Sequence, residues 1–148
     1  MPTDPTDSNY GPQLYAHYKE AVEEAKKDRS AKKTTNAEGN VYTASDGSIA
    51  VVEAKNGNYI SIEKDGSWVR VTPEGEVAAV TDKGGWVAVK PNGEVISVDE
   101  NGAASMMNIK TSEISGDYQS LELPKPPTPV GDLPAPKNPV KPTSMATS

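Results

Sequence analysis

The chain has 148 residues, a formal net charge of −6 and 34% hydrophobic residues, with no cysteine and no phenylalanine. This size and composition allow one small domain at most. The lack of cysteine excludes a disulfide framework and a cysteine-ligated zinc. No apolar run approaches the roughly 18 residues of a membrane span. The first residues lack the basic and apolar regions of a secretory signal, and the acidic balance argues against nucleic acid as a partner.

Residues 1–11 are rich in proline, aspartate and serine, which predicts an extended N-terminal arm. A helix is predicted over 12–33, because Pro12 suits a first helical turn and apolar residues follow at spacings of three and four. These residues are Leu14, Tyr18, Ala21, Val22 and Ala25. The narrow apolar stripe must pack against something, and two candidates stay open: the chain's own sheet and other chains. Residues 34–40 are predicted to be a polar linker.

A regular repeat occupies residues 41–110. Its glycines recur every nine residues, and short runs that alternate apolar residues follow them. A fixed period indicates a repeat architecture, and Asn-Gly or Asp-Gly between alternating runs favours tight hairpins. The sequence therefore predicts a mainly β fold: an antiparallel meander of nine-residue repeats, with one N-terminal α-helix and an extended proline-rich C-terminal arm. The glycines are Gly57, Gly66, Gly75, Gly84, Gly93 and Gly102.

Two-residue loops at these glycines set the predicted register. They pair Ile62 with Val69 and Val71 with Ala78, and they gather the aliphatic residues on one face, because paired residues share a face. Only at Gly57 is a three-residue loop, 55–57, preferred, since it places Ala50 and Val52 rather than Glu53 on that face. The predicted aliphatic face comprises Ile60, Ile62, Val69, Val71, Ala78, Val80, Val87, Val89, Ile96 and Val98, joined by Met107.

An aliphatic face of this size needs a cover, and the helix, closure of the meander or other copies of the chain could supply it. Two unpaired edges also favour a rotationally closed oligomer. We therefore expect the aliphatic face to be the assembly face of a homotrimer. Under this hypothesis Val80→Asp or Val87→Asp abolishes assembly and folding together, and Trp86→Ala weakens the protein much less.

The opposite face of the predicted sheet carries Tyr59, Trp68 and Trp86. Aromatic side chains on an exposed sheet can bind carbohydrate or a protein partner, or stabilise cross-strand pairs. These three residues are the candidate ligand or partner contacts, and the structural role stays open beside them.

After an irregular connector at 111–123, the region 124–148 is dominated by proline. The run PKPPTPVGDLPAPKNPVKP cannot form a helix or a central strand, so it predicts an extended polyproline-type arm. Pro126, Pro127 and Pro129 are the expected arm contacts. A linker or disordered tail, and a PxxP segment that docks in an aromatic groove, are both open alternatives.

Reactive chemistry is sparse in the sequence. His17 is the only histidine, and no nucleophile, phosphate-loop, zinc or dinucleotide motif occurs. The nearest approach to a calcium loop, DENG at 99–102, lacks the first carboxylate and the bidentate glutamate. We therefore expect no enzyme activity, no cofactor and no metal.

A helix, a glycine-punctuated β repeat and a proline-rich arm together make the chain resemble the structural proteins of tailed bacteriophages. These include spikes, needles, head fibres and capsid decoration proteins. The resemblance implies a non-enzymatic component of a capsid or tail, located in the virion, that assembles as a trimer within a larger protein assembly. It assigns no functional residue. The alternatives are a carbohydrate-binding module and an adaptor that docks through its tail, the latter with a cytoplasmic location.

Overall fold

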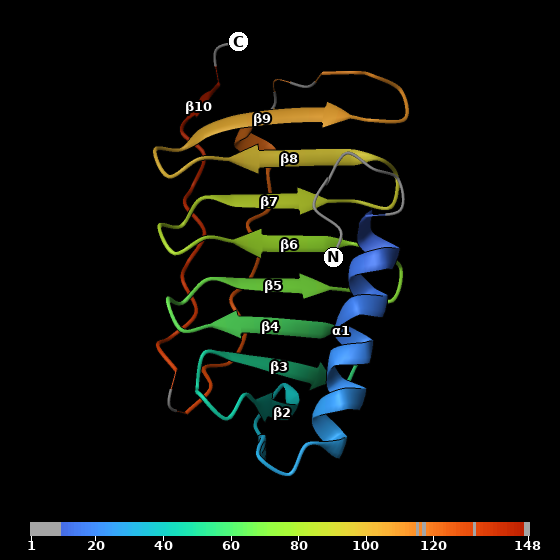
Figure 1. Ribbon diagram of the computed structural model, residues 1–148. Coiled ribbons are helices and arrows are strands. Elements are labelled where there is room, and N and C mark those ends of the chain that lie inside the picture. Colours follow the sequence, from blue (N-terminus) through green and yellow to red (C-terminus); the bar gives the residue numbers. More distant parts are fainter. Residues whose placement is uncertain (1–9, 115, 117, 132, 147–148) are drawn as a thin grey trace.

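The computed structural model describes residues 10–114, 116, 118–131 and 133–146. They form one ten-stranded sheet whose strands follow each other in sequence order. Neighbouring strands are antiparallel, except that the last strand pairs in parallel with the ninth. A single helix crosses one face, and the C-terminal segment crosses the other (Figure 1). The predicted mainly β meander with an N-terminal helix and an extended proline-rich arm is confirmed.

The elements begin and end as follows. The helix is α1 (Tyr10–Lys27), and one 3₁₀ turn, η1, spans Tyr118–Ser120. The strands are β1 (Lys32–Thr35), β2 (Gly39–Thr43), β3 (Ile49–Ala54), β4 (Tyr59–Glu63), β5 (Trp68–Val71), β6 (Val77–Val80), β7 (Trp86–Val89), β8 (Glu94–Val98), β9 (Ala103–Asn108) and β10 (Ser144–Met145).

The helix ends earlier than the predicted boundary at residue 33. The Asp28 carboxylate accepts hydrogen bonds from the backbone N–H of Ser30, at 2.9 Å, and from its hydroxyl, at 2.7 Å. Such a local turn competes with the next helical turn. The chain then enters β1, so part of the predicted linker 34–40 is strand. The predicted N-terminal arm, 1–11, falls outside the described residues except for its last two, which are helical.

Every hairpin from β3 to β9 uses a three-residue loop. At 64–66, Gly66 N donates to Glu63 O and Glu63 N donates to Ser67 O, both at 2.9 Å. Gly66 has a φ of 90°, which closes the loop after its turn. The same pair of bonds recurs at each of the other five repeat glycines. The predicted three-residue loop at 55–57 is confirmed, and the two-residue loops predicted elsewhere are wrong.

Two prolines explain this loop length. A two-residue loop at 74–75 would pair Pro73 with Glu76 and would need a backbone N–H that proline lacks. In the three-residue loop Pro73 takes the first loop position, where its φ near −65° fits a turn and no donor is needed. Pro91 stands at the same position of the loop at 91–93. These prolines were the sequence signal for the observed register.

A loop longer by one residue reverses the faces of the following strand. Ile62 pairs with Trp68, and Val71 pairs with Val77. The predicted aliphatic face is therefore divided between two faces, and this correction removes it as a single assembly surface. One face, the arm face, carries Ile60, Ile62, Trp68, Ala78, Val80, Trp86, Ile96 and Val98. The other, the helix face, carries Tyr59, Val69, Val71, Val87 and Val89. Met107 also lies on the helix face and is 39% exposed, whereas Met106 is buried on the arm face.

The helix face is covered in part by α1. Leu14, Tyr18 and Val22 pack on the right-hand ends of the strands in Figure 1, against Tyr59, Val71 and Val77. Tyr15 donates a hydrogen bond to Gly57 O at 2.8 Å, and the Tyr18 hydroxyl accepts one from Ser61 at 3.0 Å. Of the two candidates for the helix's packing partner, the structure selects the chain's own sheet.

The arm face is covered by the C-terminal segment. Val130 and Leu133 are buried in the same cluster as Trp68 and Trp86, and Tyr118 and Leu121 pack against it. A single chain thus covers the arm face and part of the helix face of its own sheet, so the most deeply buried aliphatic residues need no other copy to keep them from water.

We predict that Gly11→Ala destabilises the protein. Gly11 is buried in α1, and an added Cβ would overlap the backbone carbonyl of Gly75. The expected loss is about 1–3 kcal/mol in urea unfolding. Without that contact, the same change in a helix would stabilise by up to about 1 kcal/mol. Gln13→Ala, on the exposed side of α1, is the control and should change stability by under about 0.5 kcal/mol. A stabilised Gly11→Ala protein would contradict this docking.

We also predict that alkaline pH weakens the helix–sheet contact through Tyr18. Burial raises the pKa of Tyr18 above its ordinary value of 10.0. As pH rises, the Tyr18 hydroxyl therefore ionises in the unfolded chain before it ionises in the folded protein. The stability that neutral Tyr18 contributes is complete below pH 10 and is lost as pH rises through its folded pKa. Tyr18→Phe should cost about 1 kcal/mol at pH 8, because Ser61 loses its acceptor, and should show a shallower decline above pH 10. Urea titrations at both pH values test this, and an unchanged slope would refute it.

Candidate functional site: a proline strap

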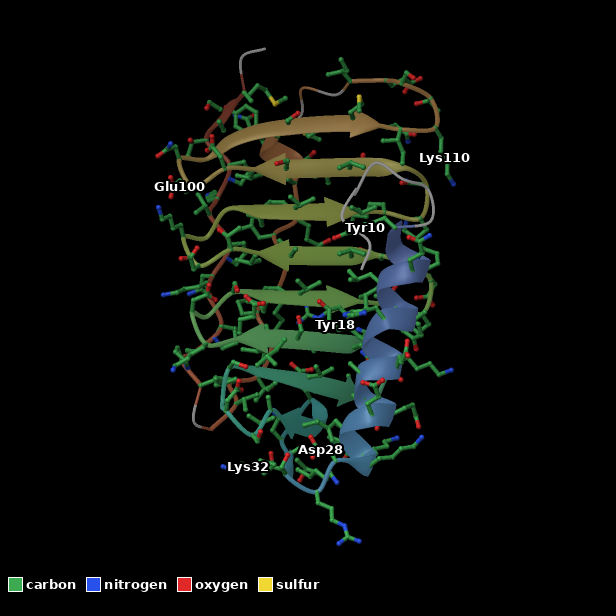
Figure 2. All side chains as sticks on the ribbon, viewed as in Figure 1. Tyr10, Tyr18, Asp28, Lys32, Glu100 and Lys110 are labelled. Atoms are coloured by element: carbon green, nitrogen blue, oxygen red, sulfur yellow. The ribbon has the colours of Figure 1, made fainter. Side chains whose placement is uncertain are left out.

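The C-terminal segment crosses the sheet twice (Figure 1). Residues 118–131, the descending limb, run behind the sheet from β9 towards β2. Residues 133–146, which we call the strap, return along one end of the strands to β10. There they meet the loops at 64–66, 82–84 and 100–102. Glu100 marks this end of the strands in Figure 2, and Lys110 marks the opposite end.

The strap is held by a two-point contact that involves one of its residues. Lys137 N donates a hydrogen bond to Gly66 O at 2.9 Å. The indole Nε1 of Trp68, two residues after that glycine, donates to Lys137 O at 2.8 Å. Both backbone groups of Lys137 are thereby satisfied. We call this arrangement a clasp.

The clasp repeats eighteen residues along the sheet and three residues along the strap. Val140 N donates to Gly84 O at 2.8 Å, and Trp86 Nε1 donates to Val140 O at 2.8 Å. Figure 1 shows why the sheet interval is eighteen residues: only every second loop faces this end. Trp68 and Trp86 are therefore equivalent residues of successive hairpins.

A third contact ends the series differently. Thr143 N donates to Gly102 O at 2.8 Å, but Ala104 stands where a third tryptophan would be. The small side chain lets the strap approach β9 and become β10, in which Ser144 and Met145 pair in parallel with Ala103 and Ala104. The edge of β9 is covered along these residues, which limits its pairing with other chains.

The spacing of the clasps follows from backbone geometry. A polyproline II strand has three residues per turn and rises about 9.3 Å per turn. Two strands of a sheet span about 9.6 Å. The strap carries Pro136, Pro139 and Pro142 at this three-residue period, so each triplet advances by one hairpin and places the residue after proline at the next glycine carbonyl.

Other contacts secure the arm and the tryptophans. Glu38 Oε1 accepts from the backbone N–H of Thr128 at 3.0 Å and from its hydroxyl at 3.2 Å, which joins the descending limb to the loop before β2. The Arg70 guanidinium lies 5.0 Å from the Trp68 ring centroid. Burial lowers the pKa of Arg70 from its ordinary value. The Asp65 carboxylate beside the strap has a lowered pKa, chiefly because the hydroxyl and backbone N–H of Ser67 donate to it.

The predicted ligand contacts do not form one surface. Trp68 and Trp86 are each 1% exposed, and their indole N–H groups donate to carbonyls of the strap. Tyr59 lies on the helix face, where its ring meets the Tyr15 ring edge to face at 5.0 Å. The predicted placement of these three residues on one exposed face is wrong, because the one-residue change of register turns the tryptophans under the arm.

The predicted arm contacts are only partly placed as expected. Pro127 is buried, Pro126 is half-buried and Pro129 is exposed. Sequence reasoning missed the residues that hold the strap, namely Lys137, Val140 and Thr143 with the glycine carbonyls. The signal was present as two matching periods: tryptophans eighteen residues apart and prolines three residues apart.

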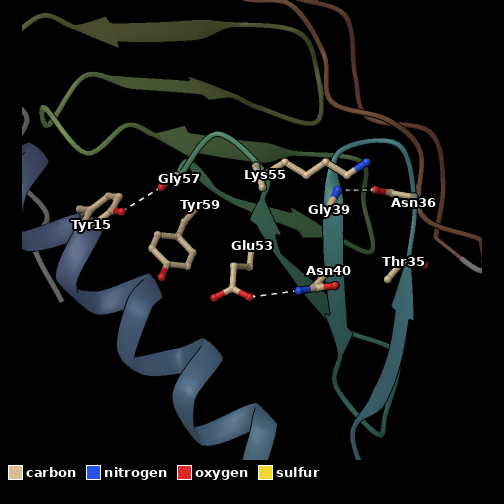
Figure 3. A pocket seen from close by; sticks show the side chains of 10 residues that line it. Tyr15, Thr35, Asn36, Gly39, Asn40, Glu53, Lys55, Gly57 and Tyr59 are labelled. Atoms are coloured by element: carbon tan, nitrogen blue, oxygen red, sulfur yellow. Dashed lines mark hydrogen bonds between the residues drawn. The ribbon is translucent and has the colours of Figure 1, made fainter.

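A cavity of about 610 Å³ lies between α1, the β1–β2 loop and the β3–β4 loop (Figure 3). At its centre, Glu53 accepts from Asn40 Nδ2 at 3.2 Å and forms an ion pair with Lys26 at 3.4 Å. The carboxylate is therefore neutralised by fixed neighbours. The Tyr15 hydroxyl donates to Gly57 O, so it too is hydrogen-bonded within the protein.

The rest of the described chain adds little reactive chemistry. Within 10–114, 116, 118–131 and 133–146, no three histidine, cysteine, aspartate or glutamate side chains gather as metal ligands would. His17 is exposed on α1, with its ring 5.4 Å from that of Tyr18. No helix in those residues has the length and apolar character needed to cross a bilayer.

Comparison with known proteins adds no relative. No family model, no curated protein and no solved structure matches this chain.

The clasps make Trp86 more important for stability than the sequence predicted, so its replacement should be strongly destabilising. Trp86→Ala should cost about 3–5 kcal/mol, because it leaves a cavity in a closed core. Trp86→Phe should cost about 1–2 kcal/mol, because the Val140 carbonyl loses its donor. The phenylalanine variant should also be cleaved faster by trypsin after Lys137, since the strap is held less firmly. Urea unfolding and timed proteolysis measure both effects. Unchanged cleavage in Trp86→Phe would show that the indole bond does not hold the strap.

Proposed function

We propose that the protein is a non-enzymatic structural subunit of a larger assembly, of the kind that spikes, fibres, decoration proteins and connectors form in bacteriophage virions. One observation carries the proposal: Trp68 and Trp86 are buried and donate their indole hydrogen bonds to the chain's own strap. The repeat builds a flat slab rather than a cleft with converging reactive groups. In the described residues, many polar side chains take part in turns, in the clasps or in ion pairs.

The slab is suited to a rigid support or spacer role. Its strands stack along one direction, and both a helix and a strap run across them (Figure 1). These two crossing elements join strands that are far apart in the sheet, so separating neighbouring strands would also break helix and strap contacts. The cross-links favour a rigid subunit, which a structural component needs and which an induced-fit binding module does not.

Self-association is proposed through the part of the helix face that α1 leaves open. Its central strip, called here the open strip, has no charged residue, and its members are half-buried apart from exposed Met107. Apolar strips of this kind are typical of protein contacts when they are contiguous. The open strip consists of Val69, Ala79, Val87, Val95 and Met107.

The solution mass tests this proposal. We expect a homotrimer, three times the 15.7-kDa chain, in light scattering coupled to size exclusion. Val87→Asp should give a folded monomer, because its half-buried side chain lies in the open strip and a charge there opposes burial. Val80→Asp should unfold the chain instead, since Val80 is 2% exposed.

The control is Thr111→Asp, at an exposed position outside the open strip, which should leave the mass unchanged. Circular dichroism separates loss of assembly from loss of folding. A wild-type monomer at every concentration tested would overturn self-association. A Val87→Asp protein that still forms the oligomer would show that the subunit contact lies outside the open strip.

A further inference from the structure

The clasps have the properties of a binding site for a defined ligand class. We propose that the strap track is a polyproline II-binding site, and that it accepts a separate peptide with the triplet Pro-X-X. The strap track comprises the loops at 64–66, 82–84 and 100–102, with Trp68 and Trp86. The strap is its resident ligand. This inference does not depend on the assembly state or on a structural role.

Each hairpin of the track recognises the backbone of one ligand residue. A fixed carbonyl accepts the N–H of that residue, and a fixed indole donates to its C=O, as at Val140 between Gly84 and Trp86. Proline cannot occupy this position, because it has no N–H to donate. It is favoured one residue earlier, where it holds the polyproline II conformation at low entropic cost. The track therefore selects, in every triplet, a proline followed by a residue that has a backbone N–H.

The non-proline positions of the ligand tolerate many side chains. Lys137, Asn138 and Lys141 are exposed, whereas Pro136 and Pro142 are buried against the protein. The bonds described above use backbone groups of the strap and no side chain of it. Specificity consequently rests on triplet spacing and on proline position, which defines a ligand class rather than one sequence.

The glycines of the track make room for this ligand. A Cβ at Gly84 would lie 2.8 Å from Val140 Cγ2, and one at Gly102 would lie 2.6 Å from Thr143 Oγ1. A Cβ at Gly47, on the neighbouring loop beyond the clasps, would meet nothing within 4 Å. Loops at the opposite end of the strands are also approached closely, as at Gly93 by Lys110 Cγ at 2.7 Å; at Gly84 and Gly102 the close neighbour is the strap.

The test uses the full-length chain with its own ligand weakened. Lys137→Pro, Val140→Pro and Thr143→Pro together remove the three N–H donors that follow the strap prolines and keep the strap extended, while Ser144 N and Ala146 N still donate to Gly102 O and Ala104 O. The matched control carries Ala135→Pro, Asn138→Pro and Lys141→Pro, at triplet positions whose N–H groups make no bond to the track in the described residues. The indole N–H resonances of Trp68 and Trp86 report occupancy, and circular dichroism reports folding.

The probe is a synthetic peptide with residues 133–146, LPAPKNPVKPTSMA. In the first variant we expect both indole resonances to move from their wild-type positions and to return as the peptide saturates the track. A peptide that carries K137P, V140P and T143P should bind at least roughly tenfold more weakly, because it lacks these N–H donors. The control protein should keep wild-type resonances without peptide.

Two results would overturn the proposal. One is a folded first variant whose indole resonances do not respond to the peptide. The other is equal binding of the two peptides, which would indicate unspecific apolar cover. If the triple variant does not fold, Val140→Pro alone replaces it. The Trp86 resonance then decides in the same way, because that variant loses only the clasp at Gly84.

Discussion

The match between a polyproline II turn and two strand spacings is the constraint on which the rest of the structure depends. Because about 9.3 Å and about 9.6 Å agree so closely, one strap residue in three can bond a glycine carbonyl and an indole in register. The strap then follows the strand ends from the β4–β5 loop to β9 without strain. It anchors the arm, whose descending limb crosses the face that holds Ile60, Ile62 and Val98 and covers these side chains.

Two covers of different kind follow from this. The helix packs mainly by side chains over part of its face, with Leu14, Tyr18 and Val22 buried and the Gly11 backbone close to that of Gly75. The arm combines buried Val130 and Leu133 with backbone hydrogen bonds, because an extended segment has no internal bonds and must find partners elsewhere. The tryptophans serve both needs, since each fills the core and satisfies a strap carbonyl. The open strip is what the helix leaves, and it is the surface through which we propose assembly.

Loop length decides which residues meet each cover. The nine-residue period admits a two-residue or a three-residue loop at each glycine, and the two differ by one position in register. Strands such as VAAV and WVAV are apolar on both sides, so hydrophobic alternation could not distinguish the faces. Pro73 and Pro91 could have done so, because each would have had to donate a hydrogen bond in the shorter loop. The position of Trp68 and Trp86 under the arm follows from that one residue.

The sequence by itself determined the elements that depend on local chemistry: the nine-residue repeat, the antiparallel order, the helix near Leu14 to Val22 and the extended proline-rich arm. Turn glycines, helical spacing and proline act within a few residues, so their patterns can be read directly. Tertiary structure alone decided where the arm lies, which strap residues the tryptophans bond and that the helix covers only part of its face. Those outcomes join residues about seventy positions apart, such as Trp68 and Lys137. The matching periods of eighteen and three residues acquire meaning only when both segments are placed side by side, because neither segment alone specifies its partner.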